Sequence, residues 1–217
     1  MSAPALPSTV TVVEHPLVHV KLTRLRDERT QTGEFRSLLA EIAGLLLCEA
    51  TRDLGTVPQR IRTPLADHDG TALVRPIVVV PILRAGLGMA EAMLPLLGGA
   101  SVCHIGMRRD ETTHLPTCYY FNMPSHLPEA DVIVVDPMLA TGNSASESIA
   151  KLKENGARHI RFVCIVSCPE GLAHLSAAHP DVRIFTAAVD SGLDARAYIV
   201  PGLGDAGDRY FGTAPSA

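Results

Sequence analysis

The feature that most constrains the fold is a series of short apolar runs, rich in β-branched residues, that alternate with longer segments of helical spacing. Each run is apolar almost throughout, whereas a half-exposed strand would alternate apolar with polar residues. The expected strands are 76–83, 100–107, 131–136, 160–166 and 182–188, and the expected helices are 34–50, 86–97, 145–156 and 169–179. The sequence therefore predicts an α/β fold with a five-stranded parallel sheet flanked by helices.

The length of 217 residues suits one domain, and we expect a disordered leader at 1–10 followed by a single domain at 11–217. The polar stretch 55–70 contains proline and glycine, and it favours a loop with an edge strand. The link 107–131 has no helical period, and its tyrosine-rich CYYFNM segment predicts a hairpin arm over 108–130.

The composition excludes several classes of partner. The net charge is −4 and lysines and arginines form no block, so the charge pattern of a protein that binds duplex nucleic acid is missing. The longest apolar stretch, 77–83, is too short to cross a membrane. Five cysteines, an odd number without a C-x-x-C pair, favour reduced thiols. We therefore expect a cytoplasmic protein with no nucleic-acid and no membrane partner.

The strand at 131–136 ends on a carboxylate, and a loop of small residues follows it. In parallel α/β sheets, ligands bind at the carboxyl ends of the strands. The loops that begin at Arg84, Met107, Asp136 and Ser167 are therefore the candidate ligand-binding loops.

The loop after Asp136 is suited to a sugar phosphate. Ser144 and Glu147 have the spacing of a capping box, which predicts a helix start at Ser144. The free N–H groups of a helix N-terminus, with the hydroxyls of Thr141 and Ser144, can bind a phosphate, while Asp136 can accept hydrogen bonds from two sugar hydroxyls. The alternative is that Asp136 only turns the chain and the small residues make a tight connection.

Arginines follow two further strands. Arg84 precedes Gly86 and Gly88, which allow a ligand to approach the backbone, and its guanidinium suits a diphosphate. The alternative for Arg84 is an ion pair with a surface carboxylate. Arg108 and Arg109 stand at the base of the expected arm, where we expect one of the two to be merely solvated.

The segment 198–213 is dense in glycine and poor in helix formers. Main-chain N–H and C=O groups in such a segment can bind the edge of a flat heterocycle, and Asp205 and Asp208 are its acids. The alternative is a glycine-rich loop with no ligand.

Together, these segments resemble the uracil phosphoribosyltransferases, a family of enzymes that use phosphoribosyl pyrophosphate (PRPP). The resemblance covers most of the chain, and its strength lies in the order of several short motifs. The motifs are HPLV at 15–18, R-x-x-x-T and then F-R around 26–36, PILRAGLGM at 81–89, GMRRDE at 106–111, VDPMLATG at 135–142, CPEG at 168–171, HPDV at 179–182 and PGLGDAGDRYFGT at 201–213.

The resemblance implies transfer of the 5-phosphoribosyl group from PRPP to uracil, giving UMP and pyrophosphate. It implies a type I phosphoribosyltransferase core with a hood from about 11–33 and 189–217, assembled as a homodimer or a larger homo-oligomer. The implied catalytic residues are Arg84, Arg109, Asp136 and Asp205. The implied PRPP site is Arg84, Arg109, Asp136, Pro137, Met138, Leu139, Ala140, Thr141, Gly142, Asn143, Ser144 and Asp205. The implied uracil pocket is Ile199, Gly204, Asp205 and Ala206.

The implied cofactor is Mg²⁺, carried by PRPP rather than by protein side chains, because the nine histidines have no metal-binding spacing. The resemblance also allows a GTP-binding site, for which the sequence identifies no residues. Two residues depart from the family pattern: Asn143 replaces a glycine of the loop, and Asn122 replaces a lysine of the arm. Asparagine tolerates a left-handed backbone, so we expect the loop to keep its shape.

Two other functions stay open at the level of sequence. A related transferase could act on xanthine, guanine or orotate, and pyrophosphate release with each base would separate these cases. A non-catalytic regulator of the same fold could instead bind RNA. The low aromatic content of 4% and the negative net charge argue against that function.

Overall fold

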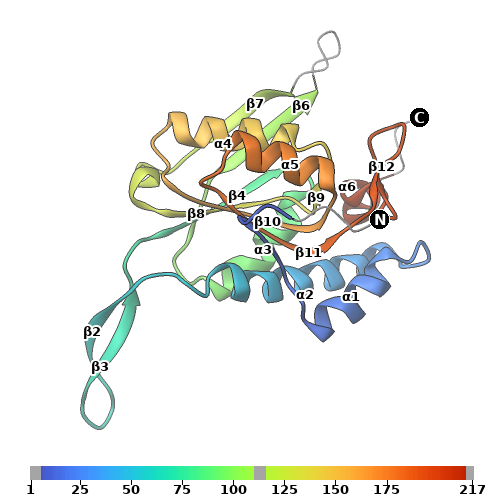
Figure 1. The fold of residues 1–217 in the computed structure, drawn as a ribbon. Coiled ribbons are helices and arrows are strands. Elements are labelled where there is room, and N and C mark those ends of the chain that lie inside the picture. The colour runs from blue at the N-terminus through green and yellow to red at the C-terminus, as the bar shows by residue number, and fades with distance from the viewer. Residues whose placement is uncertain (1–5, 110–115, 214–217) are drawn as a thin grey trace.

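The computed structural model describes residues 6–109 and 116–213. In this part of the chain the core is a mostly parallel nine-stranded sheet, with its main path in the order β1-β11-β10-β8-β4-β6-β7 (Figure 1). The strands are β1 (Val10–Val12), β4 (Ile77–Leu83), β5 (Ser101–Val102), β6 (His104–Arg109), β7 (Pro116–Asn122), β8 (Asp131–Val135), β9 (Met138–Leu139), β10 (His159–Ser167) and β11 (Arg183–Val189). All five expected strands are confirmed, and the one expected at 100–107 is divided between β5 and β6.

Helices cover both faces of the sheet (Figure 1). One face packs against α4 (Asn143–Glu154) and α5 (Pro169–Ala178), and the other packs against α1 (Pro16–Arg26), α2 (Thr32–Ala50) and α3 (Gly86–Met93). Of two 3-10 helices, η1 (Leu94–Leu96) directly follows α3, and η2 (Leu127–Glu129) directly precedes β8. The four expected helices correspond to α2, α3 with η1, α4 and α5, whereas α1 and the short α6 (Ala206–Phe211) were not predicted.

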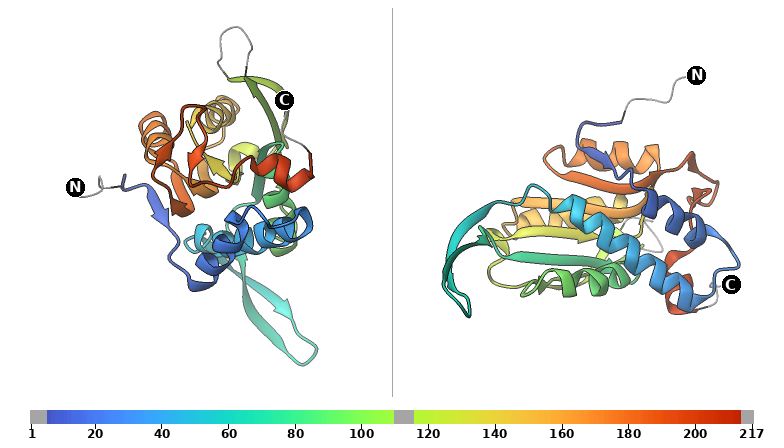
Figure 2. Two further views of the ribbon diagram at one scale, coloured as in Figure 1. Left: turned by 90° about the vertical axis from the view of Figure 1, so that its right-hand side faces the viewer. Right: turned by 90° about the horizontal axis from the view of Figure 1, so that it is seen from below.

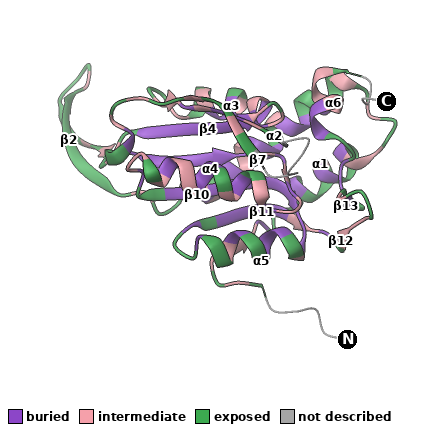
Figure 3. Cartoon of the chain, turned by 90° about the horizontal axis from the view of Figure 1, so that it is seen from above, coloured by how far each residue is buried: buried purple, intermediate pink, exposed green. Residues whose placement is uncertain are grey.

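The central strands, such as β4 and β10, are apolar over most of their length because both of their faces are buried (Figure 3). In β4, Ile77 and Val79 pack into the core on the side of α2, while Val78 and Val80 pack into the core beneath α4. Each side chain of this size that is fully buried contributes about 1.5–3 kcal/mol to folding. Because β4, β8, β10 and β11 are parallel neighbours, their carboxyl ends lie at one edge of the sheet.

Two antiparallel hairpins extend from this body. β6 and β7 pair at one end of the sheet, so the expected arm over 108–130 includes β7, while residues 110–115 lie outside the described residues. The second hairpin, β2 (Thr56–Arg62) with β3 (Asp67–Leu73), projects away from the rest of the protein (Figure 2). The prediction of a loop and one edge strand for 55–70 missed this hairpin, because its residues are mostly exposed and lack an apolar pattern.

The N-terminal segment adds a strand to the sheet. The expected leader at 1–10 is described from Leu6 onward, and Val10 already belongs to β1, where it pairs in parallel with Ile184 of β11. Within 6–109 and 116–213, every helix is too short or too polar to span a lipid bilayer.

Candidate active site

A cavity of about 410 Å³ lies at the carboxyl ends of the strands. Two regions form most of its wall. One is the loop 136–144, called the phosphate loop after its predicted ligand, and the other is residues 196–207, called the base segment. Of the predicted site residues, the structure brings together Asp136, Met138, Ala140, Thr141, Ile199, Gly204, Asp205 and Ala206 in the cavity wall. The remaining predicted loop residues, Pro137, Leu139, Gly142, Asn143 and Ser144, belong to the same loop without lining the cavity.

The phosphate loop starts where β8 ends and is fixed at its middle by β9. Met138 and Leu139 pair in parallel with Val166 and Ser167 at the end of β10. Gly142 then adopts a left-handed backbone with a φ of 82°, and α4 begins at the next residue. The sequence thus gives a strand, a tight turn and a helix within a few residues.

The start of α4 corrects the capping-box prediction. The helix begins at Asn143 with Gly142 as its N-cap, and no side chain caps it through the Ser144 and Glu147 pattern. The N–H of Asn143 lies a long 3.4 Å from the Thr141 hydroxyl, whereas Ser146 at the end of the first turn contacts His179. A helix start without a side-chain cap leaves N–H groups that can bind an anion.

Asn143 is helical, so the reason given above for its tolerance is wrong. Among the described residues other than glycine, only Ala197 has a positive φ. The left-handed residue of the loop is Gly142, and Asn143 occupies the first helical position, which any residue with an ordinary backbone can adopt.

The first turn of α5 packs against the back of the phosphate loop. Cys168 donates its S–H to the carbonyl oxygen of Ala140 at 3.1 Å. A Cβ atom on Gly171 would lie only 2.3 Å from that same oxygen, so this approach requires glycine. The CPEG motif at 168–171 therefore supports the loop backbone, a role that its sequence did not reveal.

Asp136 is half-buried in the cavity wall. Burial raises the pKa of this carboxyl from an ordinary value of 3.8 to about 7, and the Met138 N–H, at 3.5 Å from Oδ1, opposes the shift only weakly. A carboxyl group with a raised pKa in a cavity is a typical functional group. In its ionised form, Asp136 can accept hydrogen bonds from neighbouring hydroxyls.

Arg84 lies at the rim of the cavity rather than in its wall. It follows a cis peptide bond after Leu83, and its side chain is 60% exposed. The guanidinium lies 3.5 Å from Asp208 Oδ1 and 5.6 Å from the centre of the Phe211 ring, both in α6. The predicted alternative, a carboxylate partner, is therefore present, but a pair at this distance with an exposed guanidinium is weak, and an anion can displace it. The side chain of Arg109 lies outside the described residues, so its role stays a prediction.

The base segment combines one buried residue with an irregular backbone. Ile199 is buried and begins β13 (Ile199–Val200), which pairs with β12 (Gly192–Leu193). Gly204 has a φ of 69°, a conformation that favours glycine. Asp205 caps α6, because its Oδ1 accepts the N–H of Asp208 at 2.8 Å. Helix α6 was not predicted from the sequence, although an aspartate before a helix is a known cap signal.

Sequence reasoning missed further residues of the cavity wall. They are Ala85, Arg196, Ala197, Tyr198 and Gly207. Three of them form a turn around Asp194, whose Oδ1 accepts the N–H groups of Arg196 at 2.9 Å and Tyr198 at 2.8 Å. These backbone bonds, above all the one from Tyr198, hold the pKa of Asp194 below its ordinary value. Asp194 is a residue type that favours turns, so a turn could have been predicted here, but the sequence does not indicate that this turn faces a cavity.

Known proteins resemble this chain in sequence and in fold. The profile of the uracil phosphoribosyltransferase family matches residues 12–213. The uracil phosphoribosyltransferase of Rhizobium rhizogenes is 54% identical over 205 residues, which cover 94% of this chain and 98% of that protein. The uracil phosphoribosyltransferase of Dictyoglomus turgidum is 53% identical over 205 residues, with coverage of 94% and 99%.

Solved structures agree with these sequence matches. A protein from Aquifex aeolicus superposes with a TM-score of 0.90 at 32% identity, covering 95% of this chain and 100% of that one. A hypoxanthine phosphoribosyltransferase from Staphylococcus aureus has a TM-score of 0.50 at 13% identity, covering 85% and 91% of the two chains. The second likeness concerns the fold alone.

Proposed function

The chain belongs to the uracil phosphoribosyltransferase family, and from this premise we propose how its residues carry out the reaction. The protein is an enzyme of pyrimidine salvage that transfers the 5-phosphoribosyl group from PRPP to uracil, giving UMP and pyrophosphate. Its sheet and helices form a type I phosphoribosyltransferase core. The observation that best supports the roles below is the cavity that the phosphate loop and the base segment share.

The 5-phosphate of PRPP binds at residues 141–144, where α4 begins without a side-chain cap. Main-chain N–H groups and the positive end of the helix dipole favour a phosphate there. Asp136 accepts hydrogen bonds from the two ribose hydroxyls, and its place in the same cavity wall supports this role. Residues 137–140 form the backbone between the two contacts.

Uracil binds on the opposite wall of the cavity. The buried side chain of Ile199 offers an apolar surface to the flat ring, and Gly204 and Ala206 are small enough to let their main chain reach its edge. Asp205 orients the ring directly or through a water molecule. Because Oδ1 of Asp205 already caps α6, the other carboxylate oxygen, Oδ2, makes this contact with the ring.

In the reaction, uracil N1 attacks C1 of PRPP while the bond from C1 to the pyrophosphate oxygen breaks and the N1 proton is lost. Substitution at an anomeric carbon has oxocarbenium character, so the main task of the protein is to stabilise the departing pyrophosphate. Arg84 does this from the rim of the cavity after exchanging its weak contact with Asp208 for the diphosphate. Arg109 is the second predicted cation.

The residues of the cavity wall fit a Mg²⁺ ion that PRPP, rather than the protein, would hold. Asp136 and Asp205 are the carboxylates of the cavity wall, and the described residues contain no cluster of three or more acidic, histidine or cysteine side chains that could hold a metal ion. Mg²⁺ usually keeps waters and substrate phosphate oxygens as ligands, so this donor set fits a metal carried by the diphosphate. When bound, Mg²⁺ supplies charge neutralisation at the leaving group.

The enzyme assembles as a homodimer or a larger homo-oligomer. Support comes from the β2–β3 hairpin, which projects from the body and exposes Val57, Ile61 and Leu65. An isolated hairpin is only marginally stable in water, and a second copy of the chain would cover these apolar side chains. We propose that residues 11–33 and the described part of 189–217, which ends at Thr213, form the hood over the cavity. The enzyme acts in the cytoplasm, which its five unpaired cysteines support.

Pyrophosphate release with PRPP and each of four bases tests this function. We expect release with uracil to exceed release with xanthine, guanine and orotate by orders of magnitude. A preference for another base would overturn the assignment. Retention of RNA on a filter without UMP synthesis would favour the non-catalytic regulator instead.

A further inference from the structure

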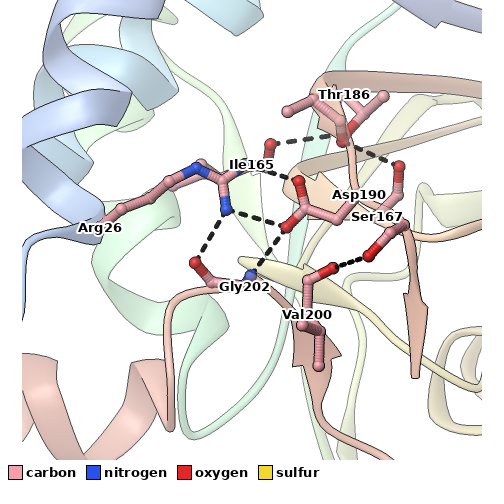
Figure 4. A network of polar contacts seen from close by, with 9 residues as sticks. Arg26, Ile165, Ser167, Thr186, Asp190, Val200 and Gly202 are labelled. Carbon is pink, nitrogen blue, oxygen red and sulfur yellow. Dashed lines mark hydrogen bonds and ion pairs between the residues drawn. The ribbon is translucent and has the colours of Figure 1, made fainter. Parts of the chain in front are cut away.

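Behind the cavity, an ion pair joins the first helix to the end of the sheet (Figure 4). Arg26, the last residue of α1, donates from Nη1 to Asp190 Oδ2 at 2.8 Å and from Nη2 to Asp190 Oδ1 at 2.6 Å. The Asp190 side chain is only 5% exposed and the Arg26 side chain 22%. A bidentate pair withdrawn from water has a fixed geometry, and losing one partner leaves the other charge buried.

The same two side chains hold the main chain of Gly202 from both sides (Figure 4). The Gly202 N–H donates to Asp190 Oδ2 at 2.9 Å, and the Gly202 carbonyl accepts from Arg26 Nη1 at 2.8 Å. Gly202 lies between Ile199 and Gly204, which both line the cavity. The pair therefore fixes the base segment at a point between its cavity-lining residues.

A second arginine fixes the next residue to the same helix end. Arg209 of α6 donates from Nη1 to the Leu203 carbonyl at 3.0 Å and from Nη2 to the carbonyl of Asp27 at 2.7 Å. Asp27 directly follows Arg26, so two consecutive residues at the end of α1 are tied to Gly202 and Leu203. The end of α1 thus acts as a support for the base segment.

This support is anchored on the strand that also anchors the phosphate loop. The Asp190 N–H donates to the carbonyl of Ser167, the last residue of β10, at 2.8 Å. Ser167 pairs in register with Leu139 of the phosphate loop. One strand end therefore supports both walls of the cavity, and the Arg26–Asp190 pair sets where the second wall stands relative to the first.

We propose that Arg26 and Asp190 are positioning residues, which place the base segment so that uracil N1 meets the anomeric carbon of PRPP. The inference rests on the proposed function. Neither residue lines the cavity, so both act through Gly202. Reacting atoms must lie about 3–3.5 Å apart, and a shift of the base segment moves the base without moving the phosphate. Loss of the pair therefore weakens ligands that carry a base and spares those that do not.

Two variants test this inference by calorimetric titration with UMP and with ribose 5-phosphate. In Asp190→Asn an amide N–H₂ replaces one of the oxygens that now accept bonds from Arg26 and Gly202, and we expect UMP to bind about tenfold more weakly. In Arg26→Lys a single ammonium cannot span both carboxylate oxygens and the Gly202 carbonyl, and we expect a loss of about threefold. Ribose 5-phosphate should bind both variants as it binds the wild-type enzyme.

A matched control is Arg161→Lys. Arg161 has a side chain that is 12% exposed, and it also joins a carboxylate, that of Asp53, to a main-chain carbonyl, that of Ala50, but at the opposite end of β10. We expect this change to leave both affinities unaltered, even if it lowers the midpoint of thermal unfolding. Arg26→Lys keeps the charge and serves as the test if Asp190→Asn does not fold.

Equal weakening of both ligands in Arg26→Lys, or no weakening of UMP, would overturn the positioning role. Failure of the wild-type enzyme to bind UMP would instead overturn the proposed function, so the two failures are distinguishable. As a second readout, KM for uracil should rise in both variants while KM for PRPP changes little.

Discussion

The phosphate loop and the base segment line one cavity, but different parts of the protein hold them in place. The phosphate loop is a contiguous piece between β8 and α4, and it is supported by main-chain pairing of β9 with β10 and by the first turn of α5. The base segment has little regular structure, and side chains from α1, from Asp190 just after β11 and from α6 hold its main chain.

This difference matches the tasks of the two regions. A phosphate is recognised by backbone N–H groups at a helix start, which a local strand, turn and helix can provide. A base is selected by its edge and shape, so the selecting wall must stand at a fixed distance from the phosphate. Here that distance depends on an ion pair between residues far apart in the chain.

The largest effect is expected at Arg84, which reaches from the end of β4 toward α6 between the two regions. We expect Arg84→Ala to lower kcat by a factor of 100 to 1000, about 3 to 4 kcal/mol of barrier, because a charge-stabilising contact to pyrophosphate is lost. Affinity for UMP, which lacks the diphosphate, should change far less. Arg158→Ala, an exposed arginine just before β10, is the control. A variant with normal steady-state rates would refute the role of Arg84.

A smaller loss is expected at Asp136 in the phosphate loop. Asp136→Asn should reduce kcat/KM for PRPP about 30-fold, about 2 kcal/mol, because charge-assisted bonds to the ribose hydroxyls are replaced by neutral ones. Its pKa of about 7 also predicts a wild-type KM for PRPP that falls between pH 6 and pH 8 as the carboxylate forms. The variant should lose this dependence, and a pH profile that persists in Asp136→Asn would assign it to another group.

The same carboxyl group of Asp136 makes the stability of the protein depend on pH in a predictable direction. Its pKa is raised in the folded protein, so the folded state keeps the proton between about pH 4 and pH 7 while the unfolded state has released it. The contribution of Asp136 to the free energy of unfolding therefore decreases as pH rises through this window. Thermal unfolding of the ligand-free proteins tests this, because the Asp136→Asn variant lacks the titrating group and should not show its share of the decrease. At pH 8 the variant should therefore have a higher midpoint of thermal unfolding than the wild type.

Gly171→Ala would disturb the phosphate loop and leave the base segment in place. The new Cβ atom would lie 2.3 Å from the Ala140 carbonyl oxygen, so the phosphate loop must shift. We expect KM for PRPP to rise about tenfold, comparable to an overpacking cost of 1 to 3 kcal/mol, while KM for uracil changes less than about twofold. Gly98→Ala is a suitable control, since a Cβ there would meet nothing within 4 Å. A rise in KM for uracil alone would contradict the division of tasks.

The smallest effect is expected at Asn143, which departs from the family pattern. Because Asn143 is helical, Asn143→Gly should change KM for PRPP by less than about twofold. Gly142→Ala is the contrasting variant, because a side chain at a φ of 82° costs about 1 to 2 kcal/mol. Steady-state kinetics of the two variants would show which position the loop depends on. A larger effect at Asn143 than at Gly142 would contradict this description.

The strand, loop and helix that make up the phosphate-loop region were predictable from sequence because they are contiguous in the chain. An apolar strand, a carboxylate, small residues and an amphipathic helix follow one another, and hydrophobic periodicity shows where each begins. The prediction was wrong at the helix start, where Gly142 rather than Ser144 is the N-cap of α4. A capping-box pattern gives no information on the backbone φ of Gly142, and this angle determines where α4 begins.

The support of the base segment was not predictable for the opposite reason. Arg26 is 164 residues from Asp190 and 176 residues from Gly202 in the sequence, and no local pattern relates them. Helix α1 escaped prediction although Val18, Leu22 and Leu25 have helical spacing, and the β2–β3 hairpin because its residues are mostly exposed. The role of the CPEG motif likewise depends on a contact between Gly171 and Ala140 that only the tertiary structure reveals.

A crystal structure of the enzyme with UMP would test most directly whether one cavity serves phosphate, ribose and base. We predict the phosphate at the N–H groups of residues 141–144, the ribose hydroxyls on Asp136 and the uracil ring between Ile199 and Ala206. A phosphate bound elsewhere, or a carboxylate of Asp136 directed into solvent with the cavity filled by side chains, would contradict the assignment.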